Sequence, residues 1–284
     1  MKSLVSNIYL ILLISLSIRY LFLSYYPIKP ITGDAQGYIS IANNLLDGKG
    51  FVFQTKTERD DGIIYPSIRR TPFYPIIIAF FIKISNNGIH LLRLFQVFLD
   101  VITTYIIFIL GKRLFSEKTG YIAAWIYTFH LPLLSLPTLI LTEAITPFFS
   151  VIIIYLLIRS FDNYRKYGYS VLLGIAVGLS ILIKPTIQLF LPFLFLITFF
   201  IFQKNKEKII QPLSIALIIS LIVISPWQWR NYSVFGTPFA IAFGGGQALY
   251  TGNHIKNDGH WVSWDQSDIV EIRQEAEKIN SDPK

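Results

Sequence analysis

The sequence predicts an all-α polytopic membrane protein, and two observations carry that prediction. Of the 284 residues, 53% are hydrophobic and 15% are aromatic, and the mean hydropathy is +0.52. Soluble domains of this size carry fewer apolar residues. The apolar residues also gather in runs of about 20, the length that a helix needs to cross a bilayer, and short polar or basic segments separate these runs.

Seven such runs are expected to form membrane spans. The first, Leu4 to Tyr26, is too long for the core of a signal peptide and lacks a small-residue cleavage pattern, so we interpret it as a retained signal anchor. Arg19 lies near the far end of this run and is expected to snorkel to the outer headgroups. The other runs are 89–110, 120–136, 138–158, 169–184, 186–202 and 209–225.

The basic residues of the loops predict how the chain weaves through the membrane. Alternate connections carry the lysines and arginines, as the positive-inside rule requires of cytoplasmic loops. This pattern accounts for much of the net charge of +8 without a nucleic-acid partner. Residues 27–72 should then lie outside, while Pro72 to Ser85 is too short to span and should form an interfacial or re-entrant helix. The basic residues are Lys112, Arg113, Lys118, Arg159, Arg165, Lys166, Lys204, Lys206 and Lys208.

The first outer loop is predicted to contain a helix along the membrane surface. Tyr38, Ala42, Leu45 and Leu46 form one apolar stripe at helical spacing, and Gly48 is placed to end the helix. Asp34 stands immediately before it, where aspartate is a favoured N-cap. The carboxylate could cap the helix, serve in chemistry, or do both, and the sequence leaves these alternatives open.

A second polar segment of the same loop, Arg69-Arg70-Thr71-Pro72, precedes the short apolar helix. Two interpretations stay open for the arginines. They could anchor the apolar segment to lipid headgroups. They could also form an anion site, because a helix N-terminus beside arginines attracts negative charge.

Further ionisable groups are expected at the same outer face. Glu143 lies in the first turns of a helix that starts outside, Lys184 ends a helix there, and Arg230 follows the last span. Ionisable residues in or near a membrane are costly and are therefore candidates for function. Arg93 and Asp100, seven residues apart on one helix face, are instead expected to be structural ion partners.

At this point the sequence resembles membrane glycosyltransferases of the GT-C fold, particularly the protein O-mannosyltransferase-like and aminoarabinose-transferase-like enzymes (glycosyltransferase families 39 and 83). The resemblance rests on the order and spacing of several motifs along most of the chain. These are Gly33-Asp34 with Tyr38, Gly48-Lys49-Gly50-Phe51, Arg70-Thr71-Pro72-Phe73-Tyr74-Pro75, Thr142-Glu143, Lys184-Pro185-Thr186, Pro226-Trp227-Gln228-Trp229-Arg230-Asn231-Tyr232, Gly236 and Gly252-Asn253.

The resemblance implies a GT-C type transmembrane helix bundle with interfacial helices in the first external loop. It also implies an inverting transfer of a sugar from a polyprenyl-phosphate donor to a lipid, glycan or protein acceptor at the outer face of the cell membrane. The family's first-loop aspartate maps onto Asp34 as general base, and its basic residue before the proline motif maps onto Arg70 as a phosphate contact. Arg69, Lys184 and Arg230 are expected to assist at the phosphate, and Glu143 and Tyr38 to support the acceptor.

No cofactor is indicated by the sequence. Zero cysteines exclude disulfides and thiolate metal sites, and His254 and His260 lack a recognisable metal spacing. We expect no metal site, and whether a divalent ion takes part stays open. The expected partners are the lipid-linked donor, the acceptor and membrane lipids, and no nucleic acid.

Residues 1–226 are expected to form the transmembrane module, with the catalytic loop at 27–72, and residues 227–284 an extracytoplasmic segment. Within that segment 267–280 has the pattern of a polar amphipathic helix, and the chain is expected to be a short form or a fragment of its family. Two alternatives remain. The intramembrane charges could line the pathway of a transporter or lipid flippase, or the chain could be a non-catalytic member.

Overall fold

The computed structural model describes residues 7–25, 31, 33–53, 67, 70–189, 196, 207–236, 241, 242 and 253. The chain divides into two units, Met1–Ile241 and Ala242–Lys284, and every helix named below belongs to the first. In the described ranges no strand is present beyond an isolated bridge at Val52. The prediction of an all-α membrane protein is therefore confirmed. The expected helix at 267–280 lies outside the described residues.

Three of the described helices are long and apolar enough to cross a membrane: α1, α4 and α10. Two shorter apolar helices, α3 and α8, accompany them. The helices and 3₁₀ turns are α1 (Ile8–Tyr25), α2 (Asp34–Leu46), α3 (Phe73–Ile84), α4 (Gly88–Leu114), α5 (Glu117–Phe129), α6 (Leu131–Ser135), η2 (Leu136–Thr138), η3 (Thr142–Ala144), α7 (Thr146–Asp162), α8 (Gly168–Ile183) and α10 (Glu207–Phe235).

The predicted runs and the observed helices differ mainly around prolines. The run 120–136 is helical only to Phe129, after which Pro132 begins the separate short helix α6. The run 138–158 becomes α-helical only at Thr146, where Pro147 occupies the first turn that suits its missing N–H. The last run is longer than expected, since α10 continues through Pro226 to Phe235. Of the run 186–202, the structure describes only 186–189 and 196.

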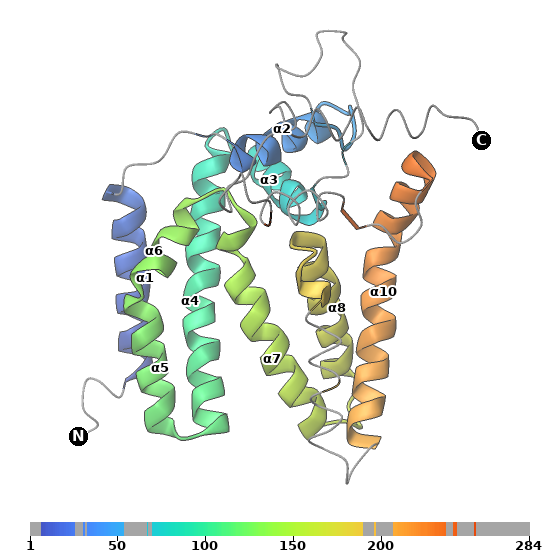
Figure 1. The fold of residues 1–284 in the computed structure, drawn as a ribbon. Helices are drawn as coiled ribbons and strands as arrows, with labels where there is room; N and C mark the ends of the chain where they lie inside the picture. Colours follow the sequence, from blue (N-terminus) through green and yellow to red (C-terminus); the bar gives the residue numbers. More distant parts are fainter. Residues whose placement is uncertain are drawn as a thin grey trace. The chain divides into compact units, whose positions relative to one another are not determined.

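The long helices alternate in direction, and the basic turns meet at one end of the bundle (Figure 1). Arg113, at the end of α4, binds Asp162 at the end of α7 with an N–O distance of 2.9 Å. Lys208, at the start of α10, lies 5.9 Å from the ring of Tyr164 in the turn before α8. We call this the basic end. The opposite end, where α2 and α3 lie beside the start of α4, is the α2 end.

A buried polar cluster joins α1 to α4 and α5. The Arg19 guanidinium forms an ion pair with Asp100, and only 1% of Arg19 is exposed. Arg19 also donates to Ser15 Oγ at 2.7 Å, and the hydroxyl of Tyr127 donates to Asp100. The expectation that Arg19 snorkels to the headgroups is therefore wrong, because an acidic partner within the bundle satisfies its charge at lower cost.

A second polar cluster fixes α3 against the α2 end of α4. The Tyr74 hydroxyl donates to Gln96 Oε1 at 2.8 Å, and Gln96 Nε2 donates to the carbonyls of Pro137 and Leu139 at 2.9 and 3.0 Å. Arg93 Nε donates to the carbonyl of Thr138 at 2.8 Å. These bonds satisfy backbone carbonyls that the proline-broken segment leaves without helical partners. Arg93 thus has a structural role, as expected, but this bond joins it to a backbone carbonyl and not to the expected ion.

Candidate active site

Asp34 and Arg70 form an ion pair at the α2 end. Arg70 Nη2 donates to Asp34 Oδ1 at 2.9 Å. The residue that caps α2 is Gly33, with a positive φ of 57°, and Asp34 is the first helical residue, so its side chain makes no capping bond. Of the alternatives that the sequence leaves open for Asp34, the structure does not show the capping role. The carboxylate is free of the helix backbone and is 68% exposed, whereas the Arg70 side chain is only 18% exposed.

The Arg70 guanidinium is held by the surface of α2. Its central carbon lies 4.5 Å from the centre of the Tyr38 ring and 5.9 Å from that of Phe53. It also lies against Gly37, where a Cβ atom would come within 2.6 Å of Arg70 Nε. Glycine at position 37 therefore makes room for the arginine. We call these contacts with Gly37, Tyr38 and Phe53 the seat of Arg70. They fix the direction of its side chain, whereas an arginine that only anchors a helix to lipid headgroups needs no fixed direction.

Tyr38 forms the floor beneath this pair. Only 9% of the residue is exposed, and its ring meets that of Tyr74 edge-on at 5.2 Å. Tyr74 is held in turn by Gln96, so a continuous packed column runs from α4 to the guanidinium. The apolar stripe predicted for α2 is confirmed for Tyr38 and Ala42, both buried, while Leu46 is exposed.

Glu143 and Lys184 form a second ion pair at the same end of the bundle. Lys184 Nζ donates to Glu143 Oε1 at 2.8 Å. Lys184 caps the end of α8, as expected, and Glu143 lies in the 3₁₀ turn η3 just before α7. Burial raises the pKa of Glu143, but hydrogen bonds from Lys184, its own backbone and Thr142 outweigh this and lower the pKa below its usual value. The carboxylate is therefore ionised at neutral pH.

One hydrogen bond joins the segment that carries Arg70 to the segment that carries Lys184. The buried hydroxyl of Thr71 donates to the carbonyl of Ile183 at 2.7 Å. Thr71 follows Arg70 directly, and Ile183 directly precedes Lys184. Covalent geometry then limits the distance between the Cα atoms of Arg70 and Lys184 to about 15 Å. Two cations from distant parts of the sequence thus lie on neighbouring segments of the structure.

Arg230 lies within α10 instead of after the last span, which corrects its expected position. Its Nη1 donates to the carbonyl of Ser67 at 2.8 Å and to Asn231 Oδ1 at 2.9 Å, and its Nη2 donates to the carbonyl of Phe51 at 3.0 Å. Arg230 therefore grips two segments of the first loop. Arg69, the remaining expected phosphate contact, lies outside the described residues.

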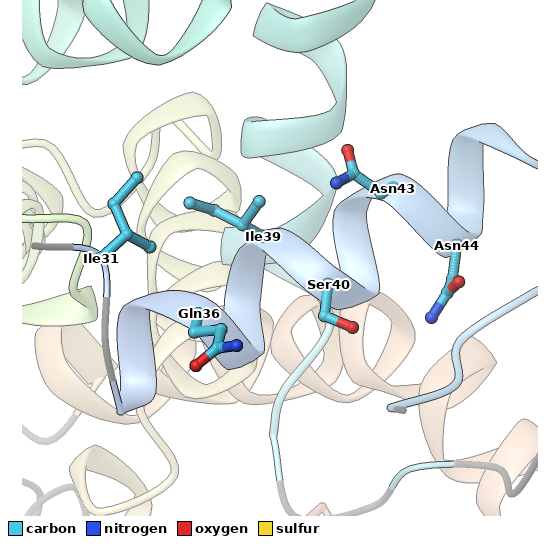
Figure 2. A pocket seen from close by; sticks show the side chains of 6 residues that line it. All are labelled: Ile31, Gln36, Ile39, Ser40, Asn43 and Asn44. Carbon is cyan, nitrogen blue, oxygen red and sulfur yellow. The ribbon is translucent and has the colours of Figure 1, made fainter. Parts of the chain in front are cut away.

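A hollow of about 310 Å³ runs along α2 (Figure 2). Gln36, Ser40, Asn43 and Asn44 line it with uncharged polar groups, and two isoleucines complete the lining. Helical spacing places Gln36 and Asn43 on the side of α2 away from Gly37 and Tyr38. The hollow begins beside the end of α2 that carries Asp34. Its isoleucines are Ile31 and Ile39.

The comparison with protein families decides the identity of the chain. The family model described as dolichyl-phosphate-mannose-protein mannosyltransferase matches residues 69–229, more than half of the chain. The chain belongs to this mannosyltransferase family. No curated protein and no solved structure matches it.

Membership in the mannosyltransferase family confirms the resemblance to GT-C glycosyltransferases, and the protein is a membrane glycosyltransferase of the GT-C type. The matched region contains Arg70, Glu143 and Lys184, whereas Asp34 precedes it and Arg230 follows it by one residue. The roles of these five side chains are therefore argued from their geometry. Throughout the described ranges, no three histidine, cysteine or acidic side chains lie close enough together to hold a metal ion.

Sequence reasoning missed two features of the site. The pairing of Glu143 with Lys184 joins residues 41 positions apart and has no local signature. The bond from Thr71 to Ile183 spans 112 positions. One available signal was Gly37 itself, because a glycine inside a helix costs about 1 kcal/mol relative to alanine and so calls for a reason in packing or function.

Proposed function

We propose that the protein transfers a sugar from a polyprenyl-phosphate carrier to an acceptor at the extracytoplasmic face of the cell membrane, with inversion at the anomeric carbon. The observation that carries this proposal is the pairing of Asp34 with Arg70. One exposed carboxylate and one seated guanidinium, 2.9 Å apart, provide a base and an anion ligand side by side.

In the proposed reaction, a hydroxyl or amine of the acceptor attacks the anomeric carbon from the face opposite the phosphate. The new bond forms as the bond from the anomeric carbon to the phosphate oxygen breaks, which inverts the configuration. Asp34 takes the proton of the acceptor, and the carrier leaves as polyprenyl phosphate. Arg70 stabilises the negative charge that develops on the departing phosphate. The carboxylate that accepts the proton is thus oriented by the cation that receives the leaving group.

Lys184 supplies a second cation for the phosphate in this proposal. Thr71 ties it to Arg70, and a third of its side chain is exposed. Glu143 holds the ammonium in place before the donor binds and limits the excess positive charge of the empty site. Arg69 is proposed as a further phosphate contact on the basis of its position next to Arg70 in the sequence.

Two observations support the remaining parts of the proposal. The basic end of the bundle lies opposite the α2 end, so the positive-inside rule favours an extracytoplasmic site. The hollow along α2 offers amide and hydroxyl groups without a charge, which suits an uncharged acceptor rich in hydroxyls. Tyr38 supports the acceptor region indirectly, as the buried floor of the ion pair.

The experiment that tests the proposal uses the purified protein with a panel of sugars linked to polyprenyl phosphate or polyprenyl diphosphate. We expect release of polyprenyl monophosphate from one monophosphate-linked donor, dependent on an added acceptor. Movement of lipid-linked sugars between the leaflets of proteoliposomes, without any release of lipid phosphate, would instead establish a flippase and overturn the proposal.

Replacing Gly37 by alanine is expected to lower the turnover of sugar transfer by about 10²-fold, because misplacing a reacting group by about 1 Å has effects of that size. The added methyl group would push the Arg70 guanidinium away from Asp34. The fold should persist, since the displaced group is the end of a long side chain. Turnover and the temperature of thermal unfolding check the two statements.

Gly168→Ala provides the matched control for this change. Gly168 is also a helical glycine, the first residue of α8, and a Cβ atom there would meet nothing within 4 Å. Its turnover should equal that of the wild type. Equal turnover in the Gly37→Ala variant as well would show that the seat of Arg70 does not matter for the reaction.

A further inference from the structure

We propose that Arg230 is a positioning residue: it fastens the first loop to α10 so that Arg70 is correctly seated, and it does not bind the donor phosphate itself. This inference rests on the proposed function for its link to the reaction. We call the bonds from Arg230 to the carbonyls of Ser67 and Phe51 the clasp, and they are present whatever reaction the protein catalyses.

The guanidinium of Arg230 joins two loop segments that are distant from it in the sequence. One Nη group donates to the carbonyl of Ser67 and the other to that of Phe51, 163 and 179 positions away. The two segments are also bonded to each other, because the Ser67 N–H donates to the same Phe51 carbonyl at 3.0 Å. A planar guanidinium suits this task, since its N–H groups diverge in a fixed fork.

Aromatic rings enclose the clasp. The central carbon of the guanidinium lies 4.8, 5.6 and 5.2 Å from the ring centres of Trp227, Phe51 and Phe235. The rings of Phe51 and Trp227 meet edge-on at 4.8 Å, and Trp227 Nε1 donates to the carbonyl of Ile241 at 2.7 Å. The faces of the aromatic rings attract the positive charge of the guanidinium, and this attraction adds to its hydrogen bonds with the loop carbonyls.

The segments held by Arg230 lead directly to Arg70. Ser67 precedes Arg70 by three residues, and Phe51 precedes Phe53 by two residues. The centre of the Phe53 ring lies 5.9 Å from the central carbon of the Arg70 guanidinium. Val52 stands between Phe51 and Phe53 in the sequence, and its carbonyl accepts a hydrogen bond from Asn44 of α2 at 3.1 Å. Loosening the clasp would therefore release both the backbone before Arg70 and an aromatic ring beside it.

The existing bonds leave little of Arg230 for a phosphate. Three of its five N–H groups donate to Ser67, Phe51 and Asn231. A two-pronged grip on phosphate, the strong form of this interaction, requires two N–H groups on one edge of the fork. The N–H of Nε and the second N–H of Nη2 make none of these bonds, but they belong to a guanidinium that two loop carbonyls hold and the rings of Trp227, Phe51 and Phe235 surround. Arg230 therefore acts through Arg70.

The first test measures the clasp without any activity. In Arg230→Lys the charge is kept, but an ammonium cannot span both carbonyls as the fork does. We expect hydrogen exchange of the Ser67 amide to accelerate at least tenfold. Exchange should stay unchanged in the control Arg113→Lys, at the basic end of the bundle. Unchanged exchange at Ser67 in Arg230→Lys would overturn the clasp, whatever reaction the protein catalyses.

The second test measures binding of a polyprenyl monophosphate in detergent micelles by calorimetry. Arg230→Lys should weaken binding about tenfold in the wild-type background, and should change nothing further in the Arg70→Gln background, because coupled residues are not additive. A direct phosphate contact gives the opposite result: lysine largely preserves binding, and any losses at the two positions add. Either of these outcomes overturns the proposal. Absence of phosphate binding in the wild type would count against the proposed function and leave the exchange result standing.

Discussion

Asp34→Asn is expected to lower the turnover of sugar transfer by about 10²–10⁴-fold, the range that a general base supplies. An asparagine side chain has nearly the same shape but cannot accept the proton of the attacking hydroxyl or amine. Because the carboxylate is 68% exposed, its loss should have little effect on folding. Turnover with a saturating lipid-linked donor is the measurement that checks this.

The control for Asp34→Asn is Asp47→Asn, which removes a carboxylate that pairs with Lys49 at 2.9 Å just after the same helix. That variant should insert into the membrane and turn over as the wild type does. Binding of polyprenyl phosphate to Asp34→Asn should persist, since Arg70 stays on the surface of α2. Normal turnover of the Asp34 variant would remove this residue from the mechanism.

The second large effect is expected at the buried ion pair between α1 and α4. Asp100→Leu leaves the Arg19 guanidinium buried without its acidic partner and should destabilise the fold by about 3–5 kcal/mol, the usual result of removing one member of a buried pair. Both side chains are almost fully enclosed, at 0% and 5% exposure. The thermal unfolding temperature of the purified protein and its steady-state amount in the membrane should both fall.

Removing both charges separates the charge effect from a simple loss of packing. The double variant Arg19→Met with Asp100→Leu should recover most of the lost stability, because an apolar pair needs no partner in this environment. In contrast, Glu117→Gln breaks an exposed pair with Lys112 and should change stability by less than about 1 kcal/mol. A double variant as unstable as Asp100→Leu would mean that the pair contributes through shape and hydrogen bonding instead of charge.

Several of the helical runs could be predicted from the sequence because hydrophobicity is read residue by residue. Gly168–Ile183 and Gly88–Leu114 lie within a few residues of the predicted runs. Helix ends near Pro132 and Pro147 were predicted less well, because a proline allows either a break or a new first turn. The spacing of Arg93 and Asp100 places them on one face of α4, but the sequence does not reveal the partner of either side chain.

The site was predictable as a set of residues and not as a set of contacts. Asp34 and Arg70 could be placed at one face from the loop in which they lie, and the structure joins them directly. Two contacts depend on how α2 and α3 pack on the bundle and could not be predicted. Gly37 makes room for the Arg70 guanidinium, and the Thr71 hydroxyl donates to the carbonyl of Ile183 in α8. Arg230 is expected to contact the phosphate because the sequence reveals only a charge near the end of a helix, whereas its bonds to Ser67 and Phe51, which support the proposed positioning role, are visible only in the structure.

The ion pair between Arg19 and Asp100 also bears on how the protein is made. Chains are synthesised from the N-terminus, so Arg19 is made 81 residues before Asp100. Until then a guanidinium must wait in or beside the bilayer without its counterion, and the arrival of α4 relieves that cost. The ion pair therefore makes the placement of α1 in the bundle depend on α4.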